Sequence, residues 1–321
     1  MLKEISIEIL RRCPNNCLHC SSMSDEKCEE MLDFEIFKKF ACDAAELGAK
    51  TICLSGGEPF AHPKIVDMVL HADSLGLQIY IYTSGITFDD SLKKVAIQYE
   101  VLKSISTKVA KLIFNIEAAT SETYNVIMGT EECFEKMKQS IQYANELLIK
   151  TEAHFVPMKL NVDEIDAVVE LCKGLGISKL SFLRLVMHGR AEENALQIAL
   201  SNEELEKIKC KLENLKIESD LDIRIGIPLS LGQSDHQCEA AKGKLNIKYD
   251  GGVYPCEVFK NDKMAQVMHE LEADNILHLT LHEIYAKSEY LKKVREISER
   301  YVCDNHCETC LGQHLLAKGG F

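Results

Sequence analysis

Three cysteines lie close together near the start of the chain, where Cys13, Cys17 and Cys20 are separated by three and then two residues. Thiolates are the usual ligands of iron–sulfur clusters, and they also bind zinc. Three thiolates leave one iron of a [4Fe–4S] cluster with an open position, where a small molecule can bind. A structural zinc site needs four ligands, and His19 could supply the fourth. The spacing alone therefore leaves both a cluster and a zinc site open.

A second group of cysteines lies toward the C-terminus. Cys238 and Cys256 flank a segment that ends in Gly251-Gly-Val-Tyr-Pro, and Cys303, Cys307 and Cys310 follow it. Two pairs of cysteines are also the pattern of a structural zinc knuckle. The remaining six of the 14 cysteines are scattered, and we expect them to pack as small apolar side chains. They are Cys28, Cys42, Cys53, Cys133, Cys172 and Cys210.

Short apolar strands alternate with helical segments over roughly the first 185 residues, which is typical of repeated βα units and a parallel sheet. The pattern predicts an α/β fold, a partial TIM-like (β/α)6 barrel that is open on one side. Its strands are expected at 3–10, 51–55, 77–82, 111–117, 152–157 and 178–185, and its helices at 32–48, 62–75, 88–103, 133–148 and 163–174.

Functional groups of parallel βα folds lie at the carboxyl ends of the strands. The Cys13–Cys20 loop, Gly56-Gly57 and Thr83-Ser84-Gly85 all follow directly on expected strands. The place of the cysteine loop after the first strand therefore favours a catalytic cluster over zinc.

The pattern changes after residue 190. A helix is expected over Ser201–Lys216, with Ser201 and Glu204 as a capping box, and a β-hairpin over Leu245–Tyr254. A helical segment over 279–300 then leads to the last cysteines. We expect a barrel core over 1–190, a linker helix and strand over 191–237, and a small auxiliary domain of hairpin and helix over 238–321.

Composition and charge exclude some functions. Hydrophobic residues make up 46% of the chain, enough for a sizeable core, yet no apolar run has membrane-spanning length and the N-terminus lacks the apolar core of a signal peptide. We therefore expect a cytoplasmic protein with no membrane partner. The net charge of −13 disfavours binding to nucleic acid.

Four segments together resemble the radical S-adenosylmethionine (SAM) superfamily over about the first 190 residues. The C-x3-C-x2-C loop resembles the superfamily signature, with His19 as the aromatic residue before the last cysteine. Ser55-Gly-Gly-Glu-Pro59 resembles its GGEP motif, and Tyr82-Thr-Ser-Gly85 resembles its T-N-G segment with serine in place of asparagine. Phe114-Asn-Ile-Glu117, with Ile127-Met-Gly129 downstream, resembles the stretch written SLDG…R-G.

The resemblance implies a set of SAM contacts. The GGEP backbone and Glu58 would hold the amino group of SAM, and Asn115 its carboxylate or ribose. A segment that resembles one in SPASM-type relatives, Leu183–Ala191, adds Arg184 or Arg190 as a contact to SAM or to a substrate carboxylate; an interdomain salt bridge is the alternative. The expected SAM-binding residues are His19, Gly56, Gly57, Glu58, Pro59, Thr83, Ser84, Asn115 and Arg184. Arg190, His188 and Glu117 are candidates for catalytic roles, with structural roles as the alternative.

The second cysteine group resembles the SPASM/twitch extension of radical SAM enzymes, which holds an auxiliary cluster. The resemblance implies one auxiliary [4Fe–4S] cluster on Cys238, Cys256, Cys307 and Cys310, with Cys303 as an alternative ligand. A cluster held by four cysteines could relay electrons, and one with a free iron could bind substrate; both alternatives stay open.

The activity implied by the resemblance is reductive cleavage of SAM to a 5′-deoxyadenosyl radical, which takes a hydrogen atom from a substrate. Relatives with SPASM or twitch domains mostly crosslink or epimerise ribosomally made peptides, so a peptide is the expected substrate. A small molecule of sugar or nucleotide type is the alternative, and a non-enzymatic zinc or iron–sulfur regulator is a third hypothesis. We expect a reductant such as flavodoxin or ferredoxin. Because the first strand begins at residue 3, peptide work is expected to need either a separate carrier protein or a peptide leader that is bound elsewhere.

Overall fold

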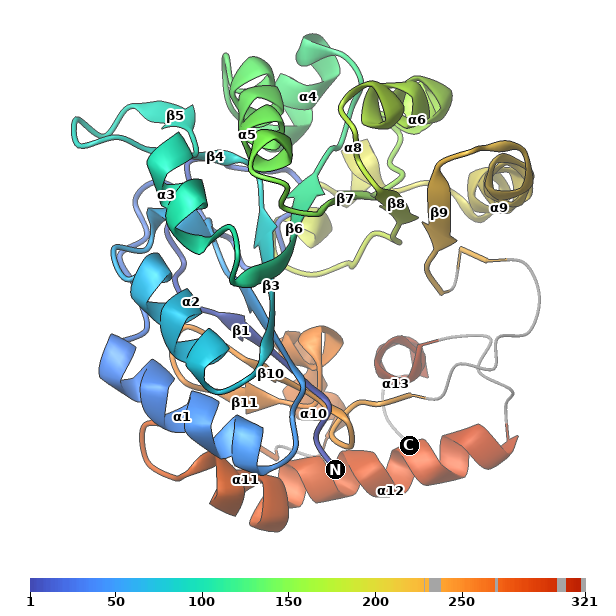
Figure 1. The fold of residues 1–321 in the computed structure, drawn as a ribbon. Helices are drawn as coiled ribbons and strands as arrows, with labels where there is room; N and C mark the ends of the chain where they lie inside the picture. The colour runs from blue at the N-terminus through green and yellow to red at the C-terminus, as the bar shows by residue number, and fades with distance from the viewer. Residues whose placement is uncertain (228, 231–237, 269–270, 305–309, 319–321) are drawn as a thin grey trace.

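One sheet of nine strands organises the computed structural model, which describes residues 1–227, 229–230, 238–268, 271–304 and 310–318 (Figure 1). The strand order is β11-β10-β1-β2-β3-β6-β7-β8-β9, and every neighbouring pair is parallel except β10 and β11. The strands are β1 (Glu4–Glu8), β2 (Thr51–Ser55), β3 (Gln78–Thr83), β6 (Val109–Asn115), β7 (Thr151–Phe155), β8 (Lys179–Phe182), β9 (Asp222–Ile225), β10 (Lys244–Ile247) and β11 (Val253–Tyr254).

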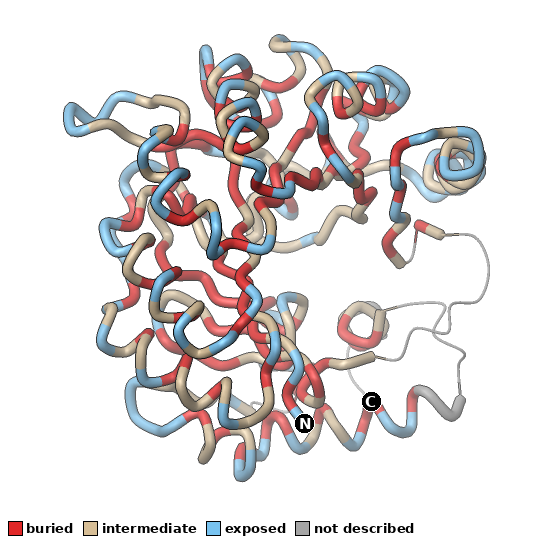
Figure 2. The backbone as a smooth tube through the Cα atoms, in the orientation of Figure 1, coloured by how far each residue is buried: buried red, intermediate tan, exposed pale blue. Residues whose placement is uncertain are grey.

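Helices lie outside the sheet and bury their apolar faces toward it (Figures 1 and 2). Ile5 and Ile7 of β1 belong to one continuous core with Phe37 and Phe40, which repeat at helical spacing in α1 (Phe34–Glu46). The other helices that follow strands of the barrel are α2 (Ile65–Ser74), α3 (Tyr99–Ile105), α4 (Ser121–Met128), α5 (Phe134–Glu146), α6 (Ile165–Gly174) and α9 (Asn202–Glu218), with the short α7 (Arg190–Glu193) and α8 (Ala195–Ile198) before α9.

The inner face of the sheet is polar. On β1 the alternate residues Glu4, Ser6 and Glu8 line a cavity of about 700 Å³, whereas Ile5 and Ile7 between them are fully buried in the core. The interior of a closed eight-stranded barrel is instead filled by branched apolar side chains. The polar residues at every second strand position therefore keep the interior of this sheet open to water and ligands.

The predicted α/β partial barrel is confirmed. The six expected strands are β1, β2, β3, β6, β7 and β8, in that order in the sheet. Three further strands extend it, because β9 pairs with β8, β10 pairs with β1, and β11 pairs with β10. The sheet thus continues beyond the six-stranded core on both sides, and the domain boundaries near residues 190 and 238 stay a prediction.

The predicted helix over 88–103 is wrong in its first half. Residues there form an antiparallel hairpin of β4 (Ile86–Phe88) and β5 (Lys94–Ala96), and α3 begins only at Tyr99. The Asp89 carboxylate accepts hydrogen bonds from the backbone N–H groups of Ser91 and Lys93, at 2.8 and 2.9 Å. Such local bonds favour a turn over a helix.

The C-terminal part follows the prediction with one difference. The capping box of Ser201 and Glu204 and the hairpin of β10 and β11 are confirmed. The helix expected over 279–300 is two helices, α11 (Leu281–Lys287) and α12 (Glu289–Asp304), separated at Ser288. The remaining helices are α10 (Lys263–Val267) and α13 (Leu311–Lys318). Among the described residues, no helix is long and apolar enough to span a bilayer.

Candidate functional site

The three-cysteine loop begins five residues after β1 and is held against the end of α4. The backbone N–H groups of Asn16 and Leu18 donate to the carbonyl oxygens of Met128 and Ile127, at 3.0 and 2.9 Å. Gly129 ends α4 with a φ of 57°, and a Cβ there would lie 2.2 Å from the Asn16 carbonyl oxygen. The Ile127-Met-Gly129 segment therefore sets the position of the loop.

Cys13, Cys17 and Cys20 all line the cavity, and none of them is in a disulfide. Burial, together with the neighbouring Cys17, raises the pKa of Cys13 well above its ordinary value. Burial and the neighbouring Cys20 likewise raise the pKa of Cys17. Clustered thiolates in a buried loop are thus costly unless metal ions compensate their charge, which is the situation in an iron–sulfur site.

A buried amide next to the cysteines has no partner within the protein. Asn15 is 1% exposed and lines the cavity, and neither its side-chain oxygen nor its side-chain nitrogen has a hydrogen-bond partner among the described residues. Buried polar groups of this kind almost always have a partner. A polar ligand such as SAM would satisfy Asn15, which the sequence pattern did not single out.

The Gly-Gly segment after β2 packs directly on the chain that leads into the cysteine loop. The Gly57 N–H donates to the Leu10 carbonyl oxygen at 2.8 Å, and the Glu58 N–H donates to that of Arg12 at 2.9 Å. A Cβ on Gly57 would lie 2.1 Å from the Arg12 carbonyl oxygen, and one on Gly56 would lie 2.3 Å from that of Leu10. Only glycine permits this approach, which brings the two segments together at the rim of the cavity.

Glu58 faces the end of β3 rather than the cavity. Its carboxylate accepts hydrogen bonds from the Thr83 hydroxyl at 2.6 Å and from the Ser84 hydroxyl and N–H at 2.7 and 2.9 Å. Burial raises the pKa of this fully buried carboxyl to about 7, against the lowering effect of these donors. Glu58 and Pro59 are not among the lining residues, whereas Thr83 and Ser84 are. We therefore propose that Glu58 positions Thr83 and Ser84 and does not itself hold the SAM amino group.

Replacing Glu58 by glutamine should destabilise the fold by about 1–3 kcal/mol. One carboxylate oxygen accepts from the backbone N–H of Phe60 and the other from that of Ser84, so either orientation of the glutamine amide sets its NH2 against a fixed donor. Urea unfolding measures the change, and equilibrium dialysis should show weaker SAM binding. Glu218→Gln, on the exposed end of α9, is the matched control. Equal behaviour of the two variants would refute the positioning role.

The expected contacts on β6 and in the cysteine loop divide between the cavity and the core. Asn115, at the end of β6, and His19 both line the cavity. Glu117 is fully buried, accepts a hydrogen bond from the Val156 N–H at 2.9 Å and lies 3.4 Å from the His19 ring nitrogen Nε2. The buried position of Glu117 favours a structural role over a catalytic one. In that role Glu117 orients the His19 ring.

The two arginines after β8 take different places. Arg190 donates to the carbonyl oxygens of Cys17 and Ser24, at 2.8 and 2.7 Å, and so holds the cysteine loop from the cavity side. Arg184 lies outside this cavity and lines a second one of about 650 Å³, where the charges of Cys310 and Cys256 act on it. The structure thus places Arg184 away from the cavity of the expected SAM contacts. His188 lines neither of these cavities.

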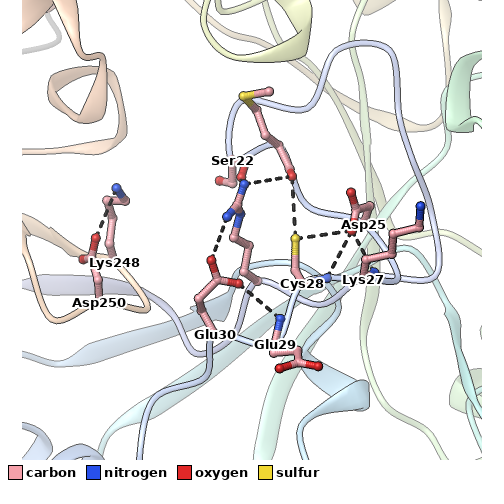
Figure 3. A network of polar contacts seen from close by, with 10 residues as sticks. Ser22, Asp25, Lys27, Cys28, Glu29, Glu30, Lys248 and Asp250 are labelled. Carbon is pink, nitrogen blue, oxygen red and sulfur yellow. Dashed lines mark hydrogen bonds and ion pairs between the residues drawn. The ribbon is translucent and has the colours of Figure 1, made fainter.

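Polar contacts fix the segment that follows the cysteine loop (Figure 3). Arg11 donates to the Ser22 carbonyl oxygen and to the Glu30 carboxylate, at 3.3 and 2.8 Å. The Asp25 carboxylate accepts from the Cys28 N–H at 3.1 Å, and the Asp25 carbonyl oxygen accepts from the Cys13 N–H at 2.9 Å. The loop is therefore braced from both of its ends.

The auxiliary cysteines are partly described. Cys238, Cys256 and Cys310 are partly buried, and none of them is in a disulfide. Burial is the main cause of the raised pKa of Cys256. Cys307 and the side chain of Cys303 lie outside the described residues, so the ligand set of Cys238, Cys256, Cys307 and Cys310 stays a prediction.

Ion pairs connect the auxiliary segment to β1, and the Lys260–Glu8 pair among them is buried. Lys260, at the end of the short helix Glu257–Lys260, pairs with Glu8, whose carboxylate also accepts from the Ser22 hydroxyl at 2.7 Å. Lys244 lies 3.0 Å from Glu4 and 3.6 Å from Glu257, the neighbour of Cys256. These pairs join the segment around Cys256 to β1, the strand that leads to the Cys13–Cys20 loop.

Replacing Lys260 by methionine should destabilise the protein by about 3–5 kcal/mol, because the buried Glu8 loses its counter-ion. The side chains of Lys260 and Glu8 are 8% and 4% exposed. The double variant Lys260→Met/Glu8→Leu should recover most of the loss in urea unfolding. Lys207→Met, which breaks an exposed pair with Glu203, should change little. A Lys260→Met variant as stable as Lys207→Met would contradict the buried pair.

Comparison with known families shows to which family the chain belongs. The model of the radical SAM superfamily matches residues 7–172, more than half of the chain. The chain belongs to the radical SAM superfamily. A second model, described as an iron–sulfur cluster-binding domain and named SPASM, matches residues 238–311. The predicted family and its auxiliary extension are thereby confirmed, and the hypothesis of a non-enzymatic regulator is set aside.

Curated relatives of this radical SAM enzyme are identical to it at about a quarter of the aligned positions. The AdoMet-dependent heme synthase of Methanosarcina barkeri is 24% identical over 347 residues, which cover 99% of this chain and 93% of the relative. The PqqA peptide cyclase of Methylorubrum extorquens is 26% identical over 289 residues, or 88% of this chain and 71% of the relative.

Solved structures share the fold at lower identity. Streptococcus suis SuiB bound to S-adenosylmethionine has a TM-score of 0.77 and 15% identity, and the match covers 98% of this chain and 74% of that one. The enzyme anSMEcpe with bound AdoMet and a peptide has a TM-score of 0.69 and 15% identity, with coverages of 93% and 84%. These matches support the partial barrel described above.

The cofactors of this radical SAM enzyme are SAM, a SAM-binding [4Fe–4S] cluster and an auxiliary [4Fe–4S] cluster. The residues present fit them. The thiols of Cys13, Cys17 and Cys20, of which the first is buried and the other two are partly buried, would hold the first cluster, and the unpartnered amide of Asn15 offers a donor and an acceptor to a polar ligand. Gly56, Gly57, Thr83, Ser84 and Asn115 line the same cavity, and we propose them as the SAM contacts.

Proposed function

We propose that this enzyme cleaves SAM reductively and takes a hydrogen atom from a ribosomally made peptide, which it crosslinks or epimerises. When bound, the cluster and SAM supply a 5′-deoxyadenosyl radical, the chemistry that the protein must direct and shield. The named relatives include a peptide cyclase, and solved structures with this fold include one with a bound precursor peptide and one with a bound peptide.

The cavity is the observation that supports this proposal most directly. It begins at Cys13, Cys17 and Cys20 and continues along the inner face of the sheet as far as β9. Its volume of about 700 Å³ lies within the range of pockets for ligands of drug size. Such a space suits SAM together with one or two side chains of a peptide, and it excludes a folded protein.

The protein residues would position and protect the reacting groups. Glu58 holds Thr83 and Ser84 at the rim, Arg190 holds the cysteine loop from within, and the Gly-Gly segment closes on residues 10–12. A crosslink removes two hydrogens from the peptide, so after the first hydrogen atom a proton and an electron must also leave, and Cys238, Cys256, Cys307 and Cys310 would hold an auxiliary cluster that could accept this electron. An epimerisation needs a hydrogen atom returned from another donor. Flavodoxin or ferredoxin is the proposed reductant. A separate carrier protein is proposed to present the peptide to the enzyme.

The test uses the anaerobically reconstituted enzyme with SAM, dithionite and short peptides encoded beside its gene. Release of 5′-deoxyadenosine should rise with the true substrate, and mass spectrometry should show loss of two hydrogens for a crosslink. In D2O an epimerised residue should instead gain one deuterium. If sugars or nucleotides stimulate the release and no peptide does, the substrate assignment is wrong.

Small-molecule chemistry is the second candidate. The heme synthase relative covers nearly the whole chain, at 99%, and its product is not a peptide. A porphyrin, sugar or nucleotide would be tested in the same assay. Its dehydrogenated or rearranged product, identified by mass spectrometry, would replace the modified peptide as the expected readout.

A further inference from the structure

Basic side chains gather on one part of the inner face, along β6, β8 and β9. Lys111, Lys179 and Arg224 project from these strands into the cavity. In the sheet register Lys179 is level with Asp222, and Ser181 is level with Arg224 on one side and with His154 on the other. His154, Ser181 and Arg224 therefore form one row across three neighbouring strands.

Most of the charges that line the cavity are neutralised by partners. Lys111 lies 2.7 Å from Glu152, and Lys179 lies 3.3 Å from Asp222. On the opposite part of the wall, Lys244 and Lys260 are paired with glutamates. Arg224 is different, because no ion pair or hydrogen bond of its side chain is found among the described residues, although it is exposed and lines the cavity.

The other two members of the row, Ser181 and His154, carry no charge that could compensate that of Arg224. Burial first, and the charge of Arg224 second, lower the pKa of His154 to about 4, so His154 is neutral near pH 7. Neutral His154 and the Ser181 hydroxyl offer hydrogen bonds without repelling an anion. Six Lys and Arg residues and four Glu residues line the cavity, within a chain of net charge −13, so the lining of the cavity carries a positive excess that the chain as a whole does not.

We propose that Arg224 binds a carboxylate of the substrate, with Ser181 and His154 as hydrogen-bonding neighbours. A guanidinium presents a planar pair of donors that matches the two oxygens of a carboxylate. Arg224 itself lies far from the Gly-Gly segment, because β9 is five places along the sheet from β2, whereas His154 is level with Asn115, one of the proposed SAM contacts. The inference rests on the proposed function, in which this cavity receives the substrate.

The carboxylate has two possible sources in a peptide, an acidic side chain or the C-terminus. Three short peptides separate them: acetylated Gly-Glu-Gly with an amidated end, its Gln counterpart with an amidated end, and acetylated Gly-Gly-Gly with a free carboxylate. Calorimetry measures their binding to the reconstituted enzyme with SAM. One or both carboxylate peptides should bind more tightly than the Gln peptide, and the tighter one names the source.

Arg224→Gln should weaken binding of the preferred carboxylate peptide at least about tenfold and leave the Gln peptide unaffected. Arg224→Lys should retain part of the affinity, because the charge remains while the fork of donors is lost. Arg300→Gln, the same substitution at an exposed position of α12, should leave the affinity unchanged. The proposal is overturned if wild type does not prefer a carboxylate peptide, or if Arg224→Gln and Arg300→Gln bind it equally.

A second measurement covers the case in which Arg224→Gln does not fold. Phenylglyoxal modifies accessible arginines, and peptide mapping of wild type should show that the preferred carboxylate peptide protects Arg224 while Arg300 stays reactive. Equal reactivity of Arg224 with and without the peptide would overturn the proposal. The same preparation is assayed for 5′-deoxyadenosine. Absent release means that the proposed function fails, whereas release without carboxylate binding means that only this inference fails.

Discussion

Replacing Cys17 by alanine should lower the iron content of the reconstituted enzyme from about eight to about four atoms per chain, because one of two [4Fe–4S] clusters is lost. Release of 5′-deoxyadenosine from SAM should fall at least about a hundredfold, since chemistry that depends on the open iron has no substitute within the protein. Cys13→Ala and Cys20→Ala should behave alike. Iron and sulfide analysis and chromatography of the nucleoside measure both effects.

Cys210→Ala is the matched control for these variants. Cys210 is exposed on α9 and lies outside both cavities, so its loss should leave iron content and nucleoside release unchanged. A Cys17→Ala protein that retains all its iron would show that another residue supplies the ligand. A Cys210→Ala protein that loses iron would show that the iron content depends on the general stability of the protein rather than on the cysteine loop.

Replacing Gly57 by alanine should destabilise the protein by about 3 kcal/mol or more, the range of overpacked sites where the backbone itself must move. The added Cβ would meet the backbone oxygens of Arg12 and Arg11, at 2.1 and 2.5 Å, and neither can move without displacing the chain that leads to Cys13. Affinity for SAM should fall with stability. Urea unfolding and equilibrium dialysis measure the two losses.

At Gly174 we expect the same substitution to be tolerated. Gly174 ends α6, and a Cβ there would meet no atom within 4 Å. Gly174→Ala should therefore be neutral or stabilising by about 0.5–1 kcal/mol, because alanine restricts the unfolded chain. If Gly57→Ala were as well tolerated as Gly174→Ala, the close approach of the Gly-Gly segment to residues 10–12 would be wrong.

The edge of the sheet that carries the cysteine loop could be predicted because local spacing determines it. Cys13, Cys17 and Cys20 follow one strand, and Gly56 and Gly57 follow the next along the sheet, so a parallel fold must bring them to the same edge. Their places at the cavity follow from strand order alone. Four of the six scattered cysteines are buried as expected, whereas Cys42 is partly buried and Cys210 is exposed.

The roles of individual side chains could not be inferred from spacing in the same way. Glu58 lies within a motif, yet its direction depends on donors from Thr83 and Ser84, which are 25 and 26 residues away. Arg184 follows β8, but it lines the second cavity and not the one that Cys13, Cys17 and Cys20 line. Long-range pairing of this kind has no local signature.

The polar inner wall does have a signature in the sequence. His154, Ser181 and Arg224 occupy alternate positions of short strands whose other positions are apolar, such as Phe155, Leu180 and Ile223. Parallel strands covered on both faces show instead continuous apolar runs. Alternation within strands that are expected to be parallel therefore indicates a polar cavity, and it distinguishes this row from the apolar core.

The most direct test of the central claim is the fate of SAM. The reconstituted, dithionite-reduced wild type should convert SAM to 5′-deoxyadenosine, and the variant with Cys13, Cys17 and Cys20 all replaced by alanine should not. Cys210→Ala, prepared in parallel, should match wild type. Nucleoside release by the triple variant, or a wild type that binds stoichiometric zinc and releases none, would contradict the assignment of this loop.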